Sequence, residues 1–416
     1  MTKNINLIYI PMQKLKTTTI GVYMHRPLNA ADVSKNAVLP YVLRQGCRLC
    51  ENSEQISKYL ENLYGAVLSA GVAEFGDDQV LRFEAETISD KYAAEGETLT
   101  ADALRLILSV MFEPVTEDGG FKKSVIAVEK SNAKDRIMSV MNDKRSYAMQ
   151  RCVEEMCAGE NYALSRYGTV EGVEEITAES LYEYYKKAVT SSVIDIYVCG
   201  DANEGELRSI VEEVTADIKF ASADIPKTEL HKNSGIKNVT DRMDVNQGKL
   251  SVGFTTDTKP EDGDYFALMV MNSVFGAGAH SKLFNNVREK LSLAYYASSN
   301  IVKSKGLLIV NAGIEFQNFQ KAYDEILLQL KAIQNGEISE EEFNSSVNAL
   351  INIFESYNDD AALTHGFYTA ERVYGTNYSL DYVKEKIKAV TVDEVAAAAR
   401  KVKLDTVYFL TGKGDN

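Results

Sequence analysis

Histidine is scarce in this sequence of 416 residues, and its scarcity excludes one kind of metal site. The four positions that carry an imidazole are His25, His231, His280 and His365. No residue from 26 to 230 can therefore bind a metal ion through a ring nitrogen. A zinc site built on two imidazoles from one helix face is thus absent from the first half of the chain.

Cysteine is also rare, and its five positions do not form the pattern of a disulfide framework. Cys47 and Cys50 have the C-x-x-C spacing, which occurs in redox pairs and in half of a zinc site. A structural zinc would need a second pair, and Cys152, Cys157 and Cys199 supply none at that spacing. We expect isolated thiols in a reducing compartment, and therefore a cytoplasmic protein.

Long apolar runs and an excess of positive charge are both missing. The run from Ile5 to Met12 is short and is broken by Pro11, so we expect neither a signal peptide nor a transmembrane span. The 45 Lys and Arg residues against 60 Asp and Glu residues give a net charge of −15. Nucleic acids and anionic membrane surfaces attract basic proteins, so we expect binding to neither.

The chain contains one organisation of elements that is used twice. Its 416 residues fit two domains of about 150 to 200 residues better than one. In the first half, YLENLYGAVLSAGV (59–72) precedes a strand-like segment, an apolar helix, and an acidic turn that ends at Phe121. In the second half, VREKLSLAYYASSN (287–300) precedes the same series, which ends at Phe343. Each half then closes with a helix followed by an apolar strand.

The spacing of apolar residues indicates the secondary structure of these halves. Alternation from Ile20 to His25 predicts a half-buried strand. Apolar residues at 104, 107, 108 and 111 predict a helix that faces the core. We predict an α+β fold of two homologous domains, each a mostly antiparallel sheet with helices packed on one face. The predicted boundaries are 1–220 for the first domain, 221–245 for a polar linker and 246–416 for the second domain.

The most informative stretch is FGAGAHSKLFNNVREKLSLAYYASSN (275–300), in which a glycine-rich turn leads into a short basic helix and a tyrosine-rich strand. The guanidinium of Arg288 is a fixed fork of donors, and the phenol of Tyr295 is a rigid donor on an apolar ring. Together they can bind peptide carbonyl groups. The residues alone leave other roles open: Arg288 can pair with Glu289 on the surface, and Tyr295 can pack in the core while Tyr296 takes its place.

This stretch, the order of elements and the duplicated half resemble the pitrilysin/insulinase family of zinc metallopeptidases, which includes the mitochondrial processing peptidase. The resemblance covers nearly the whole chain. In the degenerate, peptidase-inactive bacterial branch of the family, an LLPYVL-like helix and an LYGA segment are similar to residues 38–43 and 63–66 here. The resemblance implies that the two domains form a clam-like half-chamber, and that Arg288 and Tyr295 hold the substrate.

Active members of this family carry an inverted zinc motif, H-x-x-E-H, on a helix of the first domain, and a glutamate further on is the third ligand. The corresponding helix here is SKNAVLPYVLRQG. Aligned on its terminal glycine, the motif positions fall on Ala37, Pro40 and Tyr41. The third ligand of active relatives ends a pattern E-K-x-x-x-x-x-E, which begins here at Glu129-Lys130 and ends at Arg136, and an arginine would repel a cation. The resemblance therefore implies a member without the zinc site.

In two-chain members of the family, one subunit carries the zinc and the other supplies the arginine and tyrosine. The resemblance thus implies a non-catalytic subunit whose Arg288 and Tyr295 hold an extended peptide near the zinc of a sister subunit of similar size. The chain would need no cofactor of its own. Pairing of two identical copies, in place of pairing with a sister subunit, is an alternative arrangement. Two alternatives stay open: a scaffold protein that keeps the fold for assembly, and a peptidase with an atypical site.

Overall fold

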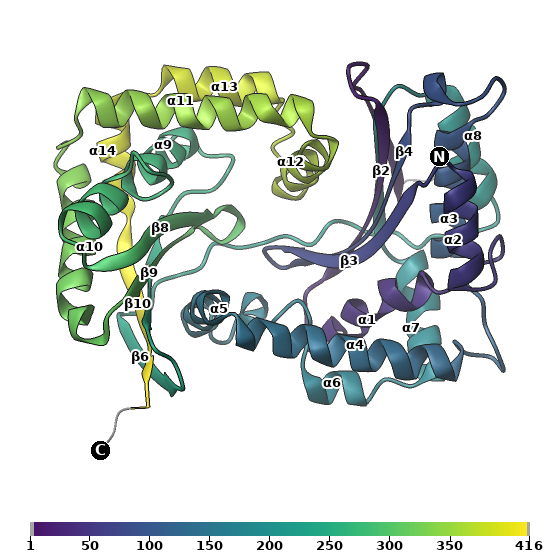
Figure 1. Ribbon diagram of the computed structural model, residues 1–416, viewed down its shortest axis with the longest axis horizontal. Helices are drawn as coiled ribbons and strands as arrows, with labels where there is room; N and C mark the ends of the chain where they lie inside the picture. The colour runs from purple at the N-terminus through teal and green to yellow at the C-terminus, as the bar shows by residue number, and fades with distance from the viewer. Residues whose placement is uncertain (1–3, 414–416) are drawn as a thin grey trace. The chain divides into compact units, whose positions relative to one another are not determined.

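The computed structural model describes residues 4–413, which contain two five-stranded sheets (Figure 1). The first sheet has the order β1 (Ile5–Pro11), β5 (Val193–Gly200), β2 (Thr17–Pro27), β4 (Asp78–Ile88), β3 (Val67–Phe75). The second has the order β6 (Lys237–Met243), β10 (Lys403–Gly412), β7 (Gly248–Thr255), β9 (Leu307–Ile314), β8 (Ala294–Val302).

The two sheets repeat one topology. In each, the first and last strands in chain order pair in parallel, β1 with β5 and β6 with β10. The other neighbours are antiparallel. Every strand of the first sheet thus has a counterpart at the same place in the second. The predicted α+β fold, with two homologous and mostly antiparallel sheets, is confirmed.

The chain packs as two compact units, and each unit includes a segment from the opposite half of the sequence. Unit 1 consists of the described residues up to Met138, together with Leu164–Lys227 and Tyr357–Val373. Unit 2 consists of Ser139–Ala163, Thr228–Ser356 and the described residues from Tyr374 onward. Within the segment predicted as a linker, β6 forms an edge strand of the second sheet.

The core of unit 1 lies between one face of the first sheet and a layer of helices (Figure 1). Ile20, Val22 and Met24 of β2 point into this core, as their alternation predicts. Helix α3 supplies the facing apolar stripe, in which Leu104 and Leu108 are buried. The helices of this half are α1 (Val33–Leu43), α2 (Ser53–Asn62), α3 (Leu99–Phe112), α4 (Lys123–Asn142), α6 (Val170–Glu174), α7 (Ala178–Thr190) and α8 (Glu204–Thr215).

The other face of the first sheet is covered by α12 (Ala361–Tyr374), which comes from the second half of the chain. Its His365 lies against Tyr23 and Tyr197, with ring centroids 6.3 and 6.0 Å away. Gly21 permits this close approach, because a Cβ there would lie 2.8 Å from Nδ1 of His365. The first sheet therefore carries one helix on the face for which we predicted no helix.

Unit 2 has the corresponding arrangement: helix α5 (Lys144–Met156), from the first half of the chain, packs against β7 and β10. A Cβ at Gly253 of β7 would lie 2.2 Å from Sδ of Met156. Buried Cys152 of α5 contacts a cluster that includes Leu307 and Tyr408 of the sheet. The remaining helices of this unit are α9 (Tyr265–Phe275), α10 (Phe319–Gln334), α11 (Glu340–Ser356), α13 (Leu380–Ala389) and α14 (Val392–Lys401).

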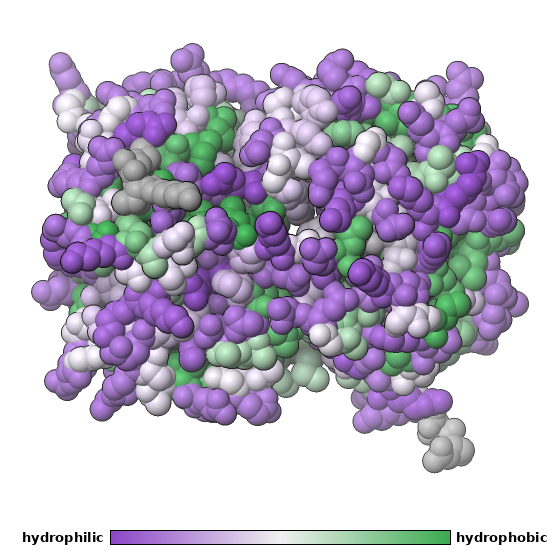
Figure 2. Space-filling model, turned by 180° about the vertical axis from the view of Figure 1, so that it is seen from behind, coloured by the Kyte–Doolittle hydropathy of each residue, from purple (hydrophilic) through white to green (hydrophobic). Residues whose placement is uncertain are grey.

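The surface agrees with the acidic, charged composition. The face shown in Figure 2 is mainly hydrophilic, and hydrophobic residues form separate small patches on it. Among residues 4–413, no helix combines the length and the apolarity that a bilayer crossing requires.

Candidate functional site

Arg288 lies near the end of η3 (Leu283–Lys290), a short π-helix between the glycine-rich turn and β8. Leu283 and Val287 are completely buried and hold this helix in place. The Arg288 side chain is 41% exposed and lies 3.5 Å from the carboxylate of its neighbour Glu289. Its guanidinium carbon is 4.6 Å from the centre of the Phe284 ring. An exposed ion pair of this kind is weak, so the guanidinium donors remain accessible to a ligand.

Tyr295 lies at an irregularity of β8, where the register with β9 shifts between Ala294 and Tyr296. Its side chain is 59% exposed, and its hydroxyl donates a hydrogen bond to the carboxylate of Glu315. This hydrogen bond raises the pKa of Tyr295. Tyr295 is therefore a surface phenol whose hydroxyl is oriented by an acidic neighbour. Sequence spacing gave no sign of Glu315, because it follows a different strand.

Tyr296 has a different environment from the tyrosine beside it. Its ring packs over Gly313, where a Cβ would lie 2.4 Å from the ring. The guanidinium carbon of Arg145 is 4.3 Å from the ring centre, and burial raises the pKa of Tyr296 to about 12. The structure thus makes Tyr295 the exposed phenol of the pair and Tyr296 the packed one.

β8 is an edge strand, which pairs with β9 alone among the described strands. Near its middle, the N–H of Ser299 donates to the carbonyl of Gly276 at 3.0 Å, so the glycine-rich turn covers that part of the edge. The beginning of the strand, at Tyr295, lies beyond this hydrogen bond. An edge of this kind can accept an extended peptide as an additional strand.

The positions of the inverted zinc motif lie on α1 and α4. Ala37 and Pro40 are buried in the packing of α1 and offer no metal ligand. The other two positions meet in space, because the guanidinium carbon of Arg136 lies 3.7 Å from the centre of the Tyr41 ring. This is a cation–π contact.

Glu129 is an acidic group beside this stack. It is 4% exposed and accepts a 2.9 Å hydrogen bond from Nε2 of Gln45. Its carboxylate also lies 3.9 Å from Nη2 of Arg136. Catalytic zinc takes three protein ligands from imidazole, thiolate or carboxylate groups, and here one carboxylate faces a guanidinium. The residues at these positions do not fit the zinc ion that the family implies.

All five cysteines are free and buried. Cys47 and Cys50 form a tight turn, in which the N–H of Cys47 donates to the carbonyl of Cys50 at 2.7 Å. Burial raises the pKa of the Cys50 thiol. A thiol with a raised pKa is mostly protonated at neutral pH and is a poor nucleophile.

One cluster that the sequence did not single out brings metal-binding side chains together. Ligand atoms of Cys157, Glu160 and His231 all lie within 4.8 Å of one another. The two ring nitrogens of His231 contact Glu160 at 2.5 Å and Asp405 at 3.2 Å. The buried ammonium of Lys305 lies 2.6 Å from the other oxygen of Glu160. Two carboxylates thus face two basic groups, and the cluster forms a closed ionic network.

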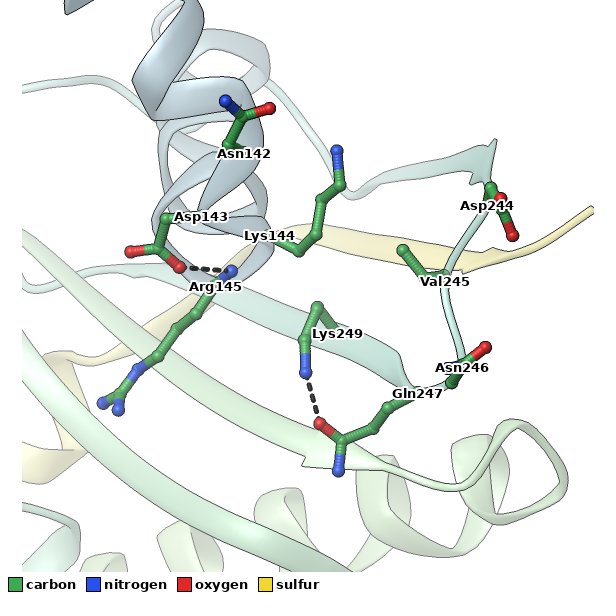
Figure 3. A pocket seen from close by; sticks show the side chains of 9 residues that line it. All are labelled: Asn142, Asp143, Lys144, Arg145, Asp244, Val245, Asn246, Gln247 and Lys249. Atoms are coloured by element: carbon green, nitrogen blue, oxygen red, sulfur yellow. Dashed lines mark hydrogen bonds between the residues drawn. The ribbon is translucent and has the colours of Figure 1, made fainter.

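A cavity of about 620 Å³ opens in unit 2, between the start of α5 and the connection from β6 to β7 (Figure 3). Three of the side chains that line it are basic: Lys144, Arg145 and Lys249. Their charged groups hydrogen-bond to neutral oxygens, in Met141, Ser298 and Gln247 respectively. The nearest charge interaction is that of Asp143, which acts on Arg145 and Lys249 without a direct hydrogen bond to either charged group. The cavity is lined by residues 142–145, 244–247 and 249.

Comparisons with known proteins agree with this fold. The chain is 35% identical to the probable inactive metalloprotease YmfF of Bacillus subtilis over 403 residues, which are 97% of this chain and 95% of that protein. A crystal structure of a conserved protein from Enterococcus faecalis superposes with a TM-score of 0.89 at 30% identity, over 100% of this chain and 98% of that chain. A protease from Helicobacter pylori shares the fold, with a TM-score of 0.82 at 16% identity over 97% and 96% of the two chains.

The family model described as the peptidase M16 inactive domain matches residues 175–350. This range contains Arg288 and Tyr295 but not the helices α1 and α4, which carry the positions of the zinc motif. The relatives, the family model and the residues at the zinc-motif positions agree. The chain belongs to the M16 (pitrilysin/insulinase) peptidase family, as one of its inactive, metalloprotease-like members.

Proposed function

We propose that this protein is the non-catalytic, peptide-binding subunit of a two-chain M16 peptidase. Arg288 and Tyr295 would hold an extended peptide, and a sister subunit of similar size would supply the zinc. The single observation that carries the proposal is the contrast between two sets of residues. The zinc-motif positions are filled by a packed Tyr41–Arg136 stack, whereas Arg288 and Tyr295 present their polar groups at the surface.

The chemistry of the surface pair supports peptide binding. The guanidinium of Arg288 offers several donors to carbonyl oxygens. The hydroxyl of Tyr295 is oriented by Glu315 and lies at the open start of edge strand β8. A peptide that adds to this edge as a strand would bring backbone carbonyls within reach of Arg288, and a backbone N–H within reach of the Tyr295 oxygen, whose own proton is donated to Glu315.

The test uses this chain together with the zinc-bearing M16 protein of the same organism, a chain of similar size that carries H-x-x-E-H. The two proteins are co-expressed, and cleavage of a fluorogenic peptide library is measured. We expect Arg288→Ala to lower kcat/KM by about 10-fold to 100-fold, because it removes a charge-assisted hydrogen bond, and Tyr295→Phe to lower it by about 3-fold to 10-fold, because it removes a neutral one. Lys331→Gln, an exposed change on α10, is the control.

Equal cleavage by the wild type and both variants would refute the peptide-binding role. A stable complex with unchanged kinetics would instead favour the scaffold alternative. Zinc analysis of the purified, untagged chain addresses the third possibility. Stoichiometric zinc together with peptidase activity of the isolated chain would overturn the proposal.

We also propose that the protein works in the cytoplasm. Its five thiols are all unpaired and buried, as expected where disulfides do not persist. Cell fractionation with an antibody against the native protein would test this placement.

A further inference from the structure

The cavity in unit 2 is unusual for a protein with a net charge of −15. Its basic side chains come from two elements: Lys144 and Arg145 from the first turn of α5, and Lys249 from β7. In Figure 3, Lys144 and Lys249 lie between α5 and the loop of residues 244–247, and Arg145 extends away from that loop. All three are bound only to neutral groups.

Two carboxylates also line the cavity, Asp143 and Asp244. The charge of Asp143 acts on Arg145 and Lys249 from a distance, but its carboxylate oxygens accept their hydrogen bonds from other groups. Asp143 is the N-cap of α5 and accepts hydrogen bonds from the N–H of Arg145 and the hydroxyl of Ser146. The hydrogen bond from Ser146 lowers the pKa of Asp143. Asp244 lies in the exposed loop on the far side of the cavity. Three cations against two carboxylates leave an excess of positive charge.

Arg145 connects this cavity with the edge strand that carries the proposed peptide-binding residues. Its guanidinium stacks on Tyr296 and donates to Oγ of Ser298 at 3.3 Å. These residues alternate along β8, so Arg145 lies along one face of the strand. Lys249 is also near, with Nζ 5.7 Å from the centre of the Tyr296 ring. A peptide added to β8 would place every second side chain on this same face.

We infer that the peptide bound by this chain carries acidic side chains, and that Lys144, Arg145 and Lys249 form the pocket that binds them. The inference rests on the proposed function and specifies the class of its substrate. Guanidinium and ammonium groups without carboxylate partners attract carboxylates. Burial lowers the pKa of Lys249, and a carboxylate ligand would offset that loss of solvation.

The experiment measures binding of fluorophore-labelled peptides to the full chain by anisotropy at low salt. The probes are peptides of about ten residues with Glu at every second position, and matched peptides with Gln in place of Glu. We expect the wild type to bind the Glu peptide about tenfold more tightly, since each partly exposed charge pair contributes about fivefold at most. Added salt should reduce this preference.

Substitutions assign the preference to the pocket. Lys249→Gln and Arg145→Gln should each reduce the preference for the Glu peptide, and the triple variant that also carries Lys144→Gln should bind both peptides equally. Lys331→Gln should keep the full preference. Circular dichroism and thermal melting confirm that each variant is folded.

The outcomes separate this inference from the proposed function. If the wild type binds Glu and Gln peptides equally, or if the triple variant keeps the preference, the basic pocket is refuted while peptide binding stands. If neither peptide binds, both ideas fail. Arg288→Ala should weaken both peptides by the same factor, because it contacts the backbone and not the acidic side chains.

Discussion

His25 holds a buried charge, and its titration provides a direct test of the first sheet. The imidazole lies between two carboxylates, with Nδ1 2.6 Å from Asp78 and Nε2 3.4 Å from Asp195. All three side chains have no exposed surface. Arg372 of α12 adds a second cation, 3.2 Å from Asp195. Burial alone would lower the pKa of His25, but the two carboxylates of Asp195 and Asp78 on either side of the ring raise it to about 9.

The shift in the pKa of His25 determines how much its protonation stabilises the folded state. A rise of the His25 pKa from 6.5 to about 9 corresponds to about 3 kcal/mol, because one unit corresponds to about 1.4 kcal/mol. The folded state holds the proton more tightly than the unfolded state does. The stabilisation is therefore fully present below pH 6.5 and is lost as the pH rises to about 9. Protonated His25 thus stabilises the fold at neutral pH.

Nuclear magnetic resonance can follow the chain's four histidines individually. The protein is deuterated, labelled with ¹³C at the histidine Cε1, and assigned by single substitutions. We expect His25 to titrate near pH 9 and His365, whose pKa burial lowers, near pH 4. His231 should titrate above its usual range because of its hydrogen bonds to Asp405 and Glu160. A His25 midpoint at or below pH 7 would refute the sandwiched imidazole.

A second readout is the free energy of unfolding in urea, followed by far-ultraviolet circular dichroism because the chain has no tryptophan. From pH 6.5 to 9 we expect a loss of about 3 kcal/mol. His280→Gln is the control, since burial lowers the pKa of His280 and keeps it neutral in this range. The variant should show the same dependence on pH as the wild type.

Two further predictions concern packing and thiol reactivity. Gly21→Ala should destabilise the protein by about 1 to 3 kcal/mol, because the new Cβ would lie 2.5 Å from the Tyr23 ring. The control in urea unfolding is Gly263→Ala, whose Cβ would meet no atom within 4 Å. Equal stability of the two variants would contradict the close contact at Gly21. Ellman's reagent should react slowly with the native chain and quickly with the unfolded one, because burial raises the pKa of Cys152 and raises that of Cys199 to about 12. Rapid modification of these thiols in the folded protein would be evidence against their burial.

The sequence contained enough information for the class and duplication of the fold. Apolar alternation in β2 and the stripe on α3 are local patterns, and both face the core as predicted. The order of elements repeats from one half to the other, and the sheets repeat it strand by strand. These features depend on neighbours in the sequence, which is why periodicity is sufficient to find them.

The exchange of α5 and α12 between the units depends on contacts that periodicity does not encode. Both helices have amphipathic sequences that would suit a sheet in either half. Their actual positions depend on glycines far away in the chain, Gly253 under Met156 and Gly21 under His365. Only the absence of a side chain at these glycines allows each helix to approach its sheet.

The same difference between local and distant information applies to the candidate site. Two separate alignments, one on the glycine that ends α1 and one on Glu129-Lys130, placed zinc-motif positions at Tyr41 and Arg136, and the fold brings these two side chains into contact. Glu315 and Arg145, which orient or cover the tyrosines of β8, lie in other elements and leave no trace in the spacing of the motif. Side chains that converge from separate strands and helices become visible only in three dimensions.

The surroundings of the zinc-motif positions, and those of Arg288 and Tyr295, also indicate the role of each set of residues in this protein. The stack of Arg136 on Tyr41 joins α4 to α1, and Glu129 pairs with the guanidinium while it accepts a hydrogen bond from Gln45. Replacing Arg136 alone would leave a buried carboxylate without its cation, which is destabilising. These positions therefore serve the stability of unit 1, and metal binding could be restored there only by rebuilding several residues together.

Arg288 and Tyr295 contribute little to the fold by comparison. Their contacts are an ion pair with a neighbouring residue, a cation–π contact with Phe284 and one surface hydrogen bond, and such exposed interactions stabilise a fold only weakly. Polar groups with so small a structural role are free to bind something outside the chain. A loss of peptide binding without a loss of stability in Arg288→Ala and Tyr295→Phe would therefore separate function from folding at this site.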